Sequence, residues 1–117
     1  MTNRKISSTN YNNQVFLTHK CALNELIFVL SKRWITDVLF SIEDGHKRFS
    51  SIKEDLQFIS DNILGERLKL LEKYKLIQKD FTNDTPTKVE YSITETGKEL
   101  SELLGNLCTF AEHKVGL

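Results

Sequence analysis

The stretch RFSSIKEDLQFISDNILGERLKLLEKYKLIQKD, residues 48–80, combines a short amphipathic segment, a break and a longer amphipathic segment. In the longer segment, leucines recur at the i, i+4, i+7 spacing of one helical face: Leu64, Leu68 and Leu71. Ser60 stands just before this segment, where a serine hydroxyl can accept a hydrogen bond from a free amide of the first turn. The pattern predicts a helix that begins after Ser60 and ends near Tyr74.

Three further helices are predicted before this one. The nearest has Ile52 and Leu56 on its inner face and either Ser50 or Ser51 as its N-cap. The helix before that ends at Gly45, because glycine readily adopts the left-handed conformation that terminates helices. Its predicted inner face comprises Trp34, Val38, Leu39 and Ile42. The first predicted core helix has an inner face formed by Leu23, Leu26, Ile27 and Leu30.

Two strands and a long helix are predicted after residue 75. The runs LIQKDF at 76–81 and KVEYSIT at 88–94 are rich in β-branched and aromatic residues, and they flank TNDTPT. Asn, Asp and Pro favour turns, so the pattern predicts a two-stranded hairpin. The last helix opens at Thr94 with Gly97 in its first turn. Its apolar stripe comprises Leu100, Leu103, Leu104, Leu107, Phe110 and Ala111.

The order helix, break, helix, hairpin is that of a winged helix-turn-helix, in which the second helix of the pair enters the major groove of DNA. The expected fold class is therefore α+β, mostly α, with the hairpin as a two-stranded β wing. We expect residues 1–17, which are rich in Asn, Ser and Thr, to form a flexible arm or a weak N-terminal helix. Residues 18–117 then form the winged helix DNA-binding domain.

Length and charge limit the possible classes of protein. A chain of 117 residues is long enough for one domain with a modest core. Sixteen basic and sixteen acidic side chains give a net charge of zero, so any basic surface must be local. The apolar runs are far too short to cross a bilayer, and the N-terminal segment lacks the apolar core of a secretory signal. A cytoplasmic location is expected.

A local positive surface is predicted around the helix that follows Ser60. From His46 to Lys79 there are eight basic and five acidic side chains. With the leucine stripe inward, Asn and Lys side chains point outward, where they can read base edges, while the helix N-terminus can meet a phosphate. The loop at 83–88 is expected near the minor groove or the backbone. The predicted DNA-binding residues are Lys47, Arg48, Ser50, Ser60, Asp61, Asn62, Gly65, Glu66, Lys69, Lys73, Lys79, Thr87 and Lys88.

The same patterns allow other interpretations. A charged outer face on a helix is usually only solvated, and a winged helix can serve as a protein interaction module without binding DNA. No glycine-rich phosphate loop, His-Glu-x-x-His or Gly-x-Ser-x-Gly motif is present, so catalysis is not expected. The residues His19, Cys21, Cys108 and His113 lack the close spacing of a metal site. No cofactor or metal is predicted.

The sequence resembles the HxlR-type winged helix regulators, which are relatives of the MarR group. The resemblance rests on RFSSI at 48–52, LEKYKLIQKD at 71–80 and PTKVEYSITETGKEL at 86–100, together with KRW at 32–34 and an upstream cysteine. It covers roughly residues 21–107.

The resemblance implies a homodimeric transcriptional regulator whose terminal helices pair two subunits on a near-palindromic site in double-stranded DNA. The leucine stripe of the last helix is more apolar surface than one small core can cover, which suits a dimer contact. Residues 95–115 are expected to be the dimerisation helix. The alternative is that this helix merely packs on the first helix of its own chain. The predicted dimerisation residues are Leu100, Leu103, Leu104, Leu107 and Phe110.

The sequence departs from the family pattern at several positions. Ala22 replaces a proline, and Lys75 replaces a glycine that normally ends the recognition helix. Cys21 matches a cysteine that some members use to sense quinones, aldehydes or disulfide stress. A helix N-terminus stabilises a thiolate, and the neighbouring Lys20 acts in the same direction. Cys21 is therefore a candidate redox sensor, or else a small packing residue, whereas Cys108 is predicted only to pack.

Overall fold

The computed structural model describes residues 22–117, and the chain divides into two compact units, Met1–Arg33 and Trp34–Leu117. The predicted arm at residues 1–17 and the candidate sensor Cys21 lie outside the described residues. Within residues 22–117, no helix is long and apolar enough to span a membrane.

The described helix of the first unit is α2 (Ala22–Leu30), as the apolar spacing predicts. Its expected role as a core helix is wrong for the single chain. Leu23, Leu26 and Ile27, on the predicted inner face, are all exposed, whereas Val29 is the buried residue of this helix. The spacing of apolar residues therefore located the helix, but it did not reveal which side the chain itself covers.

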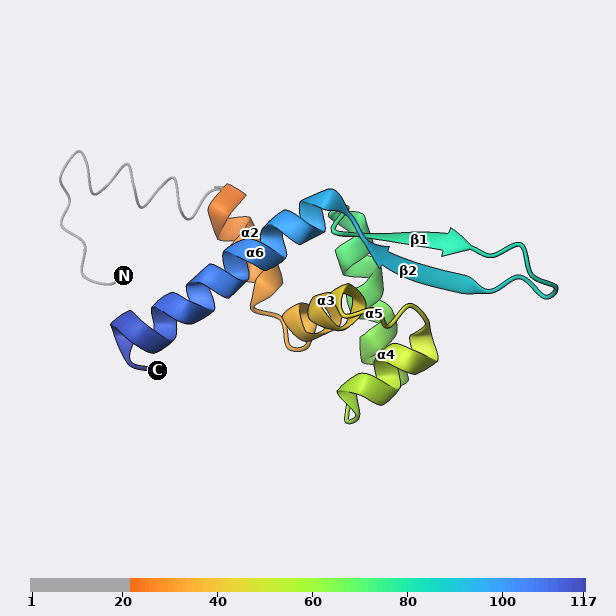
Figure 1. Cartoon of the computed structure of the whole chain (residues 1–117), viewed down its shortest axis with the longest axis horizontal. Coiled ribbons are helices and arrows are strands. Elements are labelled where there is room, and N and C mark those ends of the chain that lie inside the picture. The colour runs from red at the N-terminus through yellow and green to blue at the C-terminus, as the bar shows by residue number, and fades with distance from the viewer. Residues whose placement is uncertain (1–21) are drawn as a thin grey trace. The chain divides into compact units, whose positions relative to one another are not determined.

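The second unit contains every remaining element. In chain order these are α3 (Ile35–Glu43), α4 (Phe49–Leu56), α5 (Asp61–Lys73), β1 (Ile77–Phe81), β2 (Val89–Ile93), α6 (Glu95–Phe110) and the π-helical segment η1 (Ala111–Val115). Helices α3, α4 and α5 pack together, the hairpin extends from them as a wing, and α6 runs from the base of the hairpin in the opposite direction (Figure 1). This is a winged helix-turn-helix with α4 and α5 as the helical pair, and it confirms the predicted fold class.

The core of this unit is built from one apolar face of each helix and the start of β1. The predicted leucine stripe of α5 is buried, as is Ile52 of α4. The side chains with the least exposure are Ile35, Val38, Leu39, Ile52, Ile59, Leu64, Leu71 and Ile77. Their burial supplies the main driving force for this fold, because each apolar side chain removed from water contributes roughly 1.5–3 kcal/mol.

The helix ends agree with the predictions in part. Ser60 caps α5 through its Oγ, which accepts a hydrogen bond from Ile63 N at 3.1 Å. The predicted cap of α4 at Ser50 or Ser51 is wrong, because the N-cap is Arg48, two or three residues earlier. Arg48 has an extended backbone and makes no side-chain cap. The chain is extended here because the Lys47 carbonyl accepts a hydrogen bond from Tyr91 N of β2 at 2.8 Å, which ties this segment to the wing.

Residues with a left-handed backbone follow α3 and α5. Gly45, the predicted terminator after α3, has φ 109°. Lys75, where the family resemblance implies a glycine, has φ 60° just after α5. A side chain pays a steric penalty in this region, so lysine is less favourable here than glycine. Trp34 also has a positive φ and is the N-cap of α3 rather than a member of its inner face.

The wing is a two-stranded antiparallel ribbon. Its register pairs Ile77 with Ile93, Lys79 with Tyr91 and Phe81 with Val89, so these six side chains share one face of the ribbon. Gln78 and Asp80 lie on the other face, opposite Ser92 and Glu90. The two strands confirm the predicted hairpin.

A close backbone contact joins the wing to α6. Thr94 caps α6 by accepting a hydrogen bond from Gly97 N at 3.0 Å, and its hydroxyl donates to the carbonyl of Lys75 at 2.7 Å. A Cβ atom at Gly97 would overlap the carbonyl oxygen of Leu76 and press on the side chain of Ile93. Glycine is therefore required at 97, and it fixes where α6 leaves the wing.

We expect Gly97→Ala to destabilise the protein by about 3 kcal/mol, since the added methyl group must displace a backbone carbonyl rather than a flexible side chain. Chemical denaturation monitored by circular dichroism measures this loss. Gly105→Ala is the matched control, because a Cβ at Gly105, also in α6, meets no atom within 4 Å. A Gly97→Ala protein as stable as the control contradicts the account of this junction.

Candidate nucleic-acid interface

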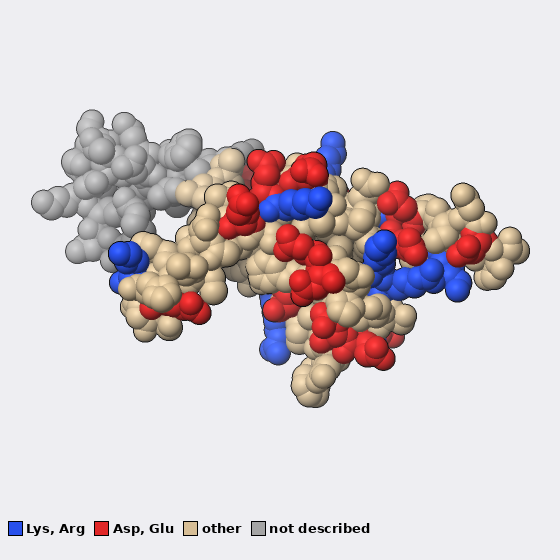
Figure 2. Space-filling view, viewed as in Figure 1, with Lys and Arg blue, Asp and Glu red and all other residues tan. Residues whose placement is uncertain are grey.

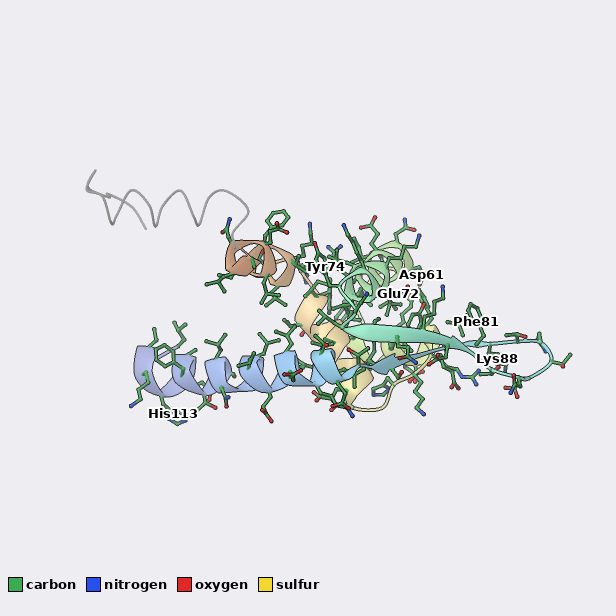
Figure 3. The ribbon with its side chains drawn as sticks, turned by 90° about the horizontal axis from the view of Figure 1, so that it is seen from above. Asp61, Glu72, Tyr74, Phe81, Lys88 and His113 are labelled. Atoms are coloured by element: carbon green, nitrogen blue, oxygen red, sulfur yellow. The ribbon has the colours of Figure 1, made fainter. Side chains whose placement is uncertain are left out.

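One side of α5 is free of the protein core. Asn62, Glu66, Lys69 and Lys73 are exposed, whereas the leucine stripe of the same helix is buried. Gly65 lies between these two sides, and a Cβ there would meet no atom within 4 Å. The helix is seen nearly end-on in Figure 3, with side chains projecting away from the rest of the unit. The structure therefore gathers the predicted α5 residues on one surface.

The N-terminal end of α5 is fixed by Lys53 of α4. Its ammonium donates to the carbonyl of Ile59 at 2.9 Å and lies 3.2 Å from a carboxylate oxygen of Asp61. The Ser60 hydroxyl caps the same end. Lys53 thus holds the turn between the two helices, and it partly neutralises Asp61, which stands where a phosphate would approach.

Two other acidic residues near this surface also have basic partners. Glu66 lies 3.5 Å from Arg67, and Glu90 of the wing lies 3.2 Å from Arg48. Within residues 22–117, no ion pair involves Lys47, Lys69 or Lys88, and all three are exposed. The acidic residues that weaken the case for DNA binding in the sequence are therefore partly compensated, while these three lysines keep their charge available.

Arg48, which is predicted to bind DNA, pairs with a carboxylate of the wing. Its guanidinium donates to Glu90 Oε2 at 3.2 Å, and both side chains are partly exposed. This pair joins the start of α4 to β2 beside the hydrogen bond between Tyr91 and Lys47. Arg48 thus helps to hold the wing against α4. Exposed pairs of this kind contribute roughly 0–1 kcal/mol, so the backbone hydrogen bond and the core do most of the holding.

The base of the wing also lies against α5. Burial raises the pKa of Tyr91, and the nearby carboxylate of Glu72 in α5 raises it further. Tyr91 shares its ribbon face with Lys79 and Phe81, and Phe81 projects on the side of the ribbon where α5 lies (Figure 3).

The remaining predicted residues are all at the surface. Ser50 is exposed in the first turn of α4, Lys79 is exposed in β1, and Thr87 is exposed in the loop between the strands. The structure thus brings the start of α4, the outer side of α5 and the wing into one unit. Whether each side chain contacts a duplex stays a prediction.

Phe58 and Phe81 are among the exposed aromatic residues that the sequence pattern did not single out. Phe58 lies in the turn before α5, next to Gln57, which has φ 58°. Phe81 ends β1 with 65% of its surface exposed. The alternation of β1 places Phe81 on the same face as the buried Ile77, so the sequence pattern alone suggests an inward side chain. The feature of the sequence that could have indicated its exposure is its position directly before the TNDTPT loop, at the end of the strand far from the core.

The charges are unevenly spread over the surface. On the face seen in Figure 2, acidic side chains spread over α3, α4 and α6, while basic side chains gather beside the wing. Helix α5 lies behind α3 and α4 in this view (Figure 1). The acidic face therefore points away from the outer side of α5, which suits a molecule that meets a polyanion from the other side.

Helix α6 carries a second surface, which is apolar and exposed among residues 22–117. Leu103, Leu107 and Phe110 are exposed, whereas Leu104 is only half-buried and Leu100 is buried with 7% exposure. Including Leu100 in a surface for a second subunit is therefore wrong, because its own chain already covers it. Cys108 is exposed on the same helix, with its Sγ 4.0 Å from a carboxylate oxygen of Glu112, so its predicted packing role is not found in the single chain.

Comparison with known proteins identifies relatives across most of the chain. The family model described as HxlR-like helix-turn-helix matches residues 29–116. The transcriptional regulator YvaP of Bacillus subtilis, of helix-turn-helix type, is 40% identical over 83 residues, which span 71% of this chain and 77% of YvaP. The regulator YodB of the same organism is 36% identical over 84 residues, covering 72% of this chain and 75% of YodB.

Solved structures agree with these relatives. The reduced form of YodB superposes with a TM-score of 0.73 at 35% identity, over 80% of this chain and 93% of that one. The redox regulator HypR in its oxidised form superposes with a TM-score of 0.69 at 26% identity, over 79% of this chain and 95% of that one. Further solved forms of YodB are diamide-treated and quinone-bound.

Proposed function

The chain belongs to the HxlR-like helix-turn-helix family of transcriptional regulators, and from this premise we propose that it acts in the cytoplasm as a homodimer on a near-palindromic DNA site. The members identified by comparison are transcriptional regulators rather than enzymes. The observation that carries the proposal is the outer side of α5, where exposed lysines and an asparagine lie beside the wing and opposite a buried leucine stripe.

In this proposal α5 lies in the major groove. The Asn62 amide can donate to and accept from base edges that differ between base pairs, the Lys69 ammonium can donate to them, and Gly65 leaves room for close approach of the helix backbone. Lys47 and Lys88 contact phosphates on either side, which sets the register and supplies salt-dependent affinity. Two copies of α5 would read half-sites about 34 Å apart, one helical turn of DNA.

We expect Lys69→Ala to weaken binding to a selected site by about 1–3 kcal/mol and to relax its sequence preference, because a bidentate contact to a base is lost. Lys88→Ala should weaken binding to every duplex and lower the salt slope by about 1. Both are measured by fluorescence anisotropy on fragments that the wild-type protein selects from sheared genomic DNA.

Lys98→Ala is the matched control, because Lys98 is exposed on α6 and pairs with Glu95. If all three variants bind duplexes as the wild type does, the assigned surface is wrong. If the wild type itself selects no DNA, a protein interaction module with the same fold becomes the better description.

The second subunit is proposed to cover the exposed apolar side of α6, formed by Leu103, Leu107 and Phe110 with half-buried Leu104 at its edge. Leucine and phenylalanine side chains this exposed are unfavourable in water unless a partner buries them. An isologous contact in a two-fold dimer brings the same surface of both subunits together. The two winged helices are then held as a pair.

Leu107→Asp should convert the dimer into a monomer, because a buried carboxylate without a partner is strongly disfavoured. Sedimentation equilibrium measures the mass, and circular dichroism checks that the helices remain. Thr109→Asp adds the same charge on another side of α6 and should leave the dimer intact. A Leu107→Asp protein that still dimerises as tightly as the wild type places the subunit contact elsewhere.

A response to thiol-reactive stress through Cys21 is also proposed. The support is the family resemblance and the redox chemistry named in the solved forms of YodB and HypR. In the sequence Cys21 immediately precedes Ala22, the first residue of α2, and a helix N-terminus favours a thiolate.

Diamide should change the DNA affinity of the wild type by about tenfold or more, a change of at least 1.4 kcal/mol. The Cys21→Ser protein should bind DNA but show no such change, and Cys108→Ser serves as the cysteine control. Titration of each protein with and without diamide on the same duplex measures the effect. An undiminished response in Cys21→Ser removes Cys21 as the sensor.

A further inference from the structure

Packing in the protein core does not explain why a phenylalanine stands at position 81, because its ring is exposed. Phe81 ends β1, with 65% of its surface accessible, and it is paired across the ribbon with Val89. A phenylalanine in this position gains little from burial in its own chain, while it leaves apolar area in water. Asp80, which precedes Phe81 in β1, is also exposed, so this part of the strand accommodates a polar residue.

The ring faces the same side as the proposed DNA-reading helix. Phe81, Lys79 and Tyr91 share one face of the ribbon, and the carboxylate of Glu72 in α5 is close enough to Tyr91 to affect its ionisation. Figure 3 shows Phe81 projecting from the ribbon on the side where α5 lies. A duplex that contacts the outer side of α5 would therefore pass along this face of the wing.

A positive charge stands next to the ring. The ammonium of Lys79 lies 5.9 Å from the centre of the Phe81 ring, within the range of a cation–π contact. The opposite face of the ribbon has a different character, since it carries Asp80 and Glu90. The face toward α5 thus offers an apolar ring and a cation side by side, while the other face offers carboxylates.

This pairing matches the chemistry of a DNA backbone. Each repeat of the backbone has a phosphate, which attracts an ammonium group, and a deoxyribose, whose carbon edge is apolar and borders the minor groove. We propose that Lys79 and Phe81 together contact one phosphate–deoxyribose unit beside the major groove occupied by α5, with the ring packed on the sugar. This inference rests on the proposed DNA binding of α5, and it assigns a binding role to a residue outside the lysines and polar residues named above.

Removal of the two side chains should affect DNA affinity and its salt dependence differently. Contact between a ring and a sugar depends on burial of apolar surface, so Phe81→Ala should weaken binding about tenfold at both low and high salt, with an unchanged salt slope. Lys79→Ala should lower the slope by about 1, because one phosphate contact is lost. Phe81→Leu keeps an apolar side chain and should retain most of the affinity.

The contact can be located with hydroxyl radicals, which attack deoxyribose hydrogens at the minor-groove edge. The probe is a 30-base-pair duplex selected by the wild-type protein from a random library, and footprints are compared at equal occupancy. Phe81→Ala should lose protection at a few sugars flanking the α5 site. Gln78→Ala is the matched control, because Gln78 is exposed on the opposite face of the same strand.

The outcomes separate this inference from the proposed function. If Lys69→Ala weakens binding while Phe81→Ala leaves affinity and footprint unchanged, DNA binding stands and the role of Phe81 is overturned. A reduced salt slope in Phe81→Ala also overturns it, because the ring would then act only by holding Lys79. If neither the wild type nor any variant binds a duplex, both proposals fail together.

Discussion

The burial of the α5 leucine stripe is the constraint on which the rest of the second unit depends. Leu64 and Leu71 are fully inaccessible and Leu68 is nearly so, and α3 and α4 supply the apolar side chains around them. A helix held along three successive turns cannot rotate about its axis without exposing a leucine. The polar residues of α5 are therefore held on the outside by the core rather than by contacts of their own.

The wing is held by several weak contacts instead of one strong one. Tyr91 N donates to the carbonyl of Lys47, Arg48 pairs with Glu90, and the phenol of Tyr91 lies near Glu72. The first two link the wing to the segment just before α4, and the third lies at α5. Together with the buried Ile77 at the start of β1, they hold the ribbon against the helical pair.

Periodicity was sufficient to find the helices, the hairpin and the cap at Ser60, because each depends on residues close together in the sequence. Periodicity failed where contacts between segments far apart in the sequence determine where a helix starts, which side chains pair and which are buried. The start of α4 follows from the pairing of Lys47 with Tyr91, more than forty positions later, and the partners of Arg48 and Asp61 are likewise set by packing. The alternation in β1 and the stripe in α6 likewise did not indicate that Phe81 is exposed and Leu100 is buried, since which part of an apolar pattern is covered depends on the tertiary fold.

The junction at Gly97 has a mechanical consequence. Strand β2 ends at Ile93 and α6 starts at Glu95, and the backbone of α6 touches the carbonyl of Leu76 with no side chain between them. The first turn of α6 is therefore in direct backbone contact with the residue that precedes β1. A tilt of α6 that keeps this contact would therefore turn the root of the ribbon with it.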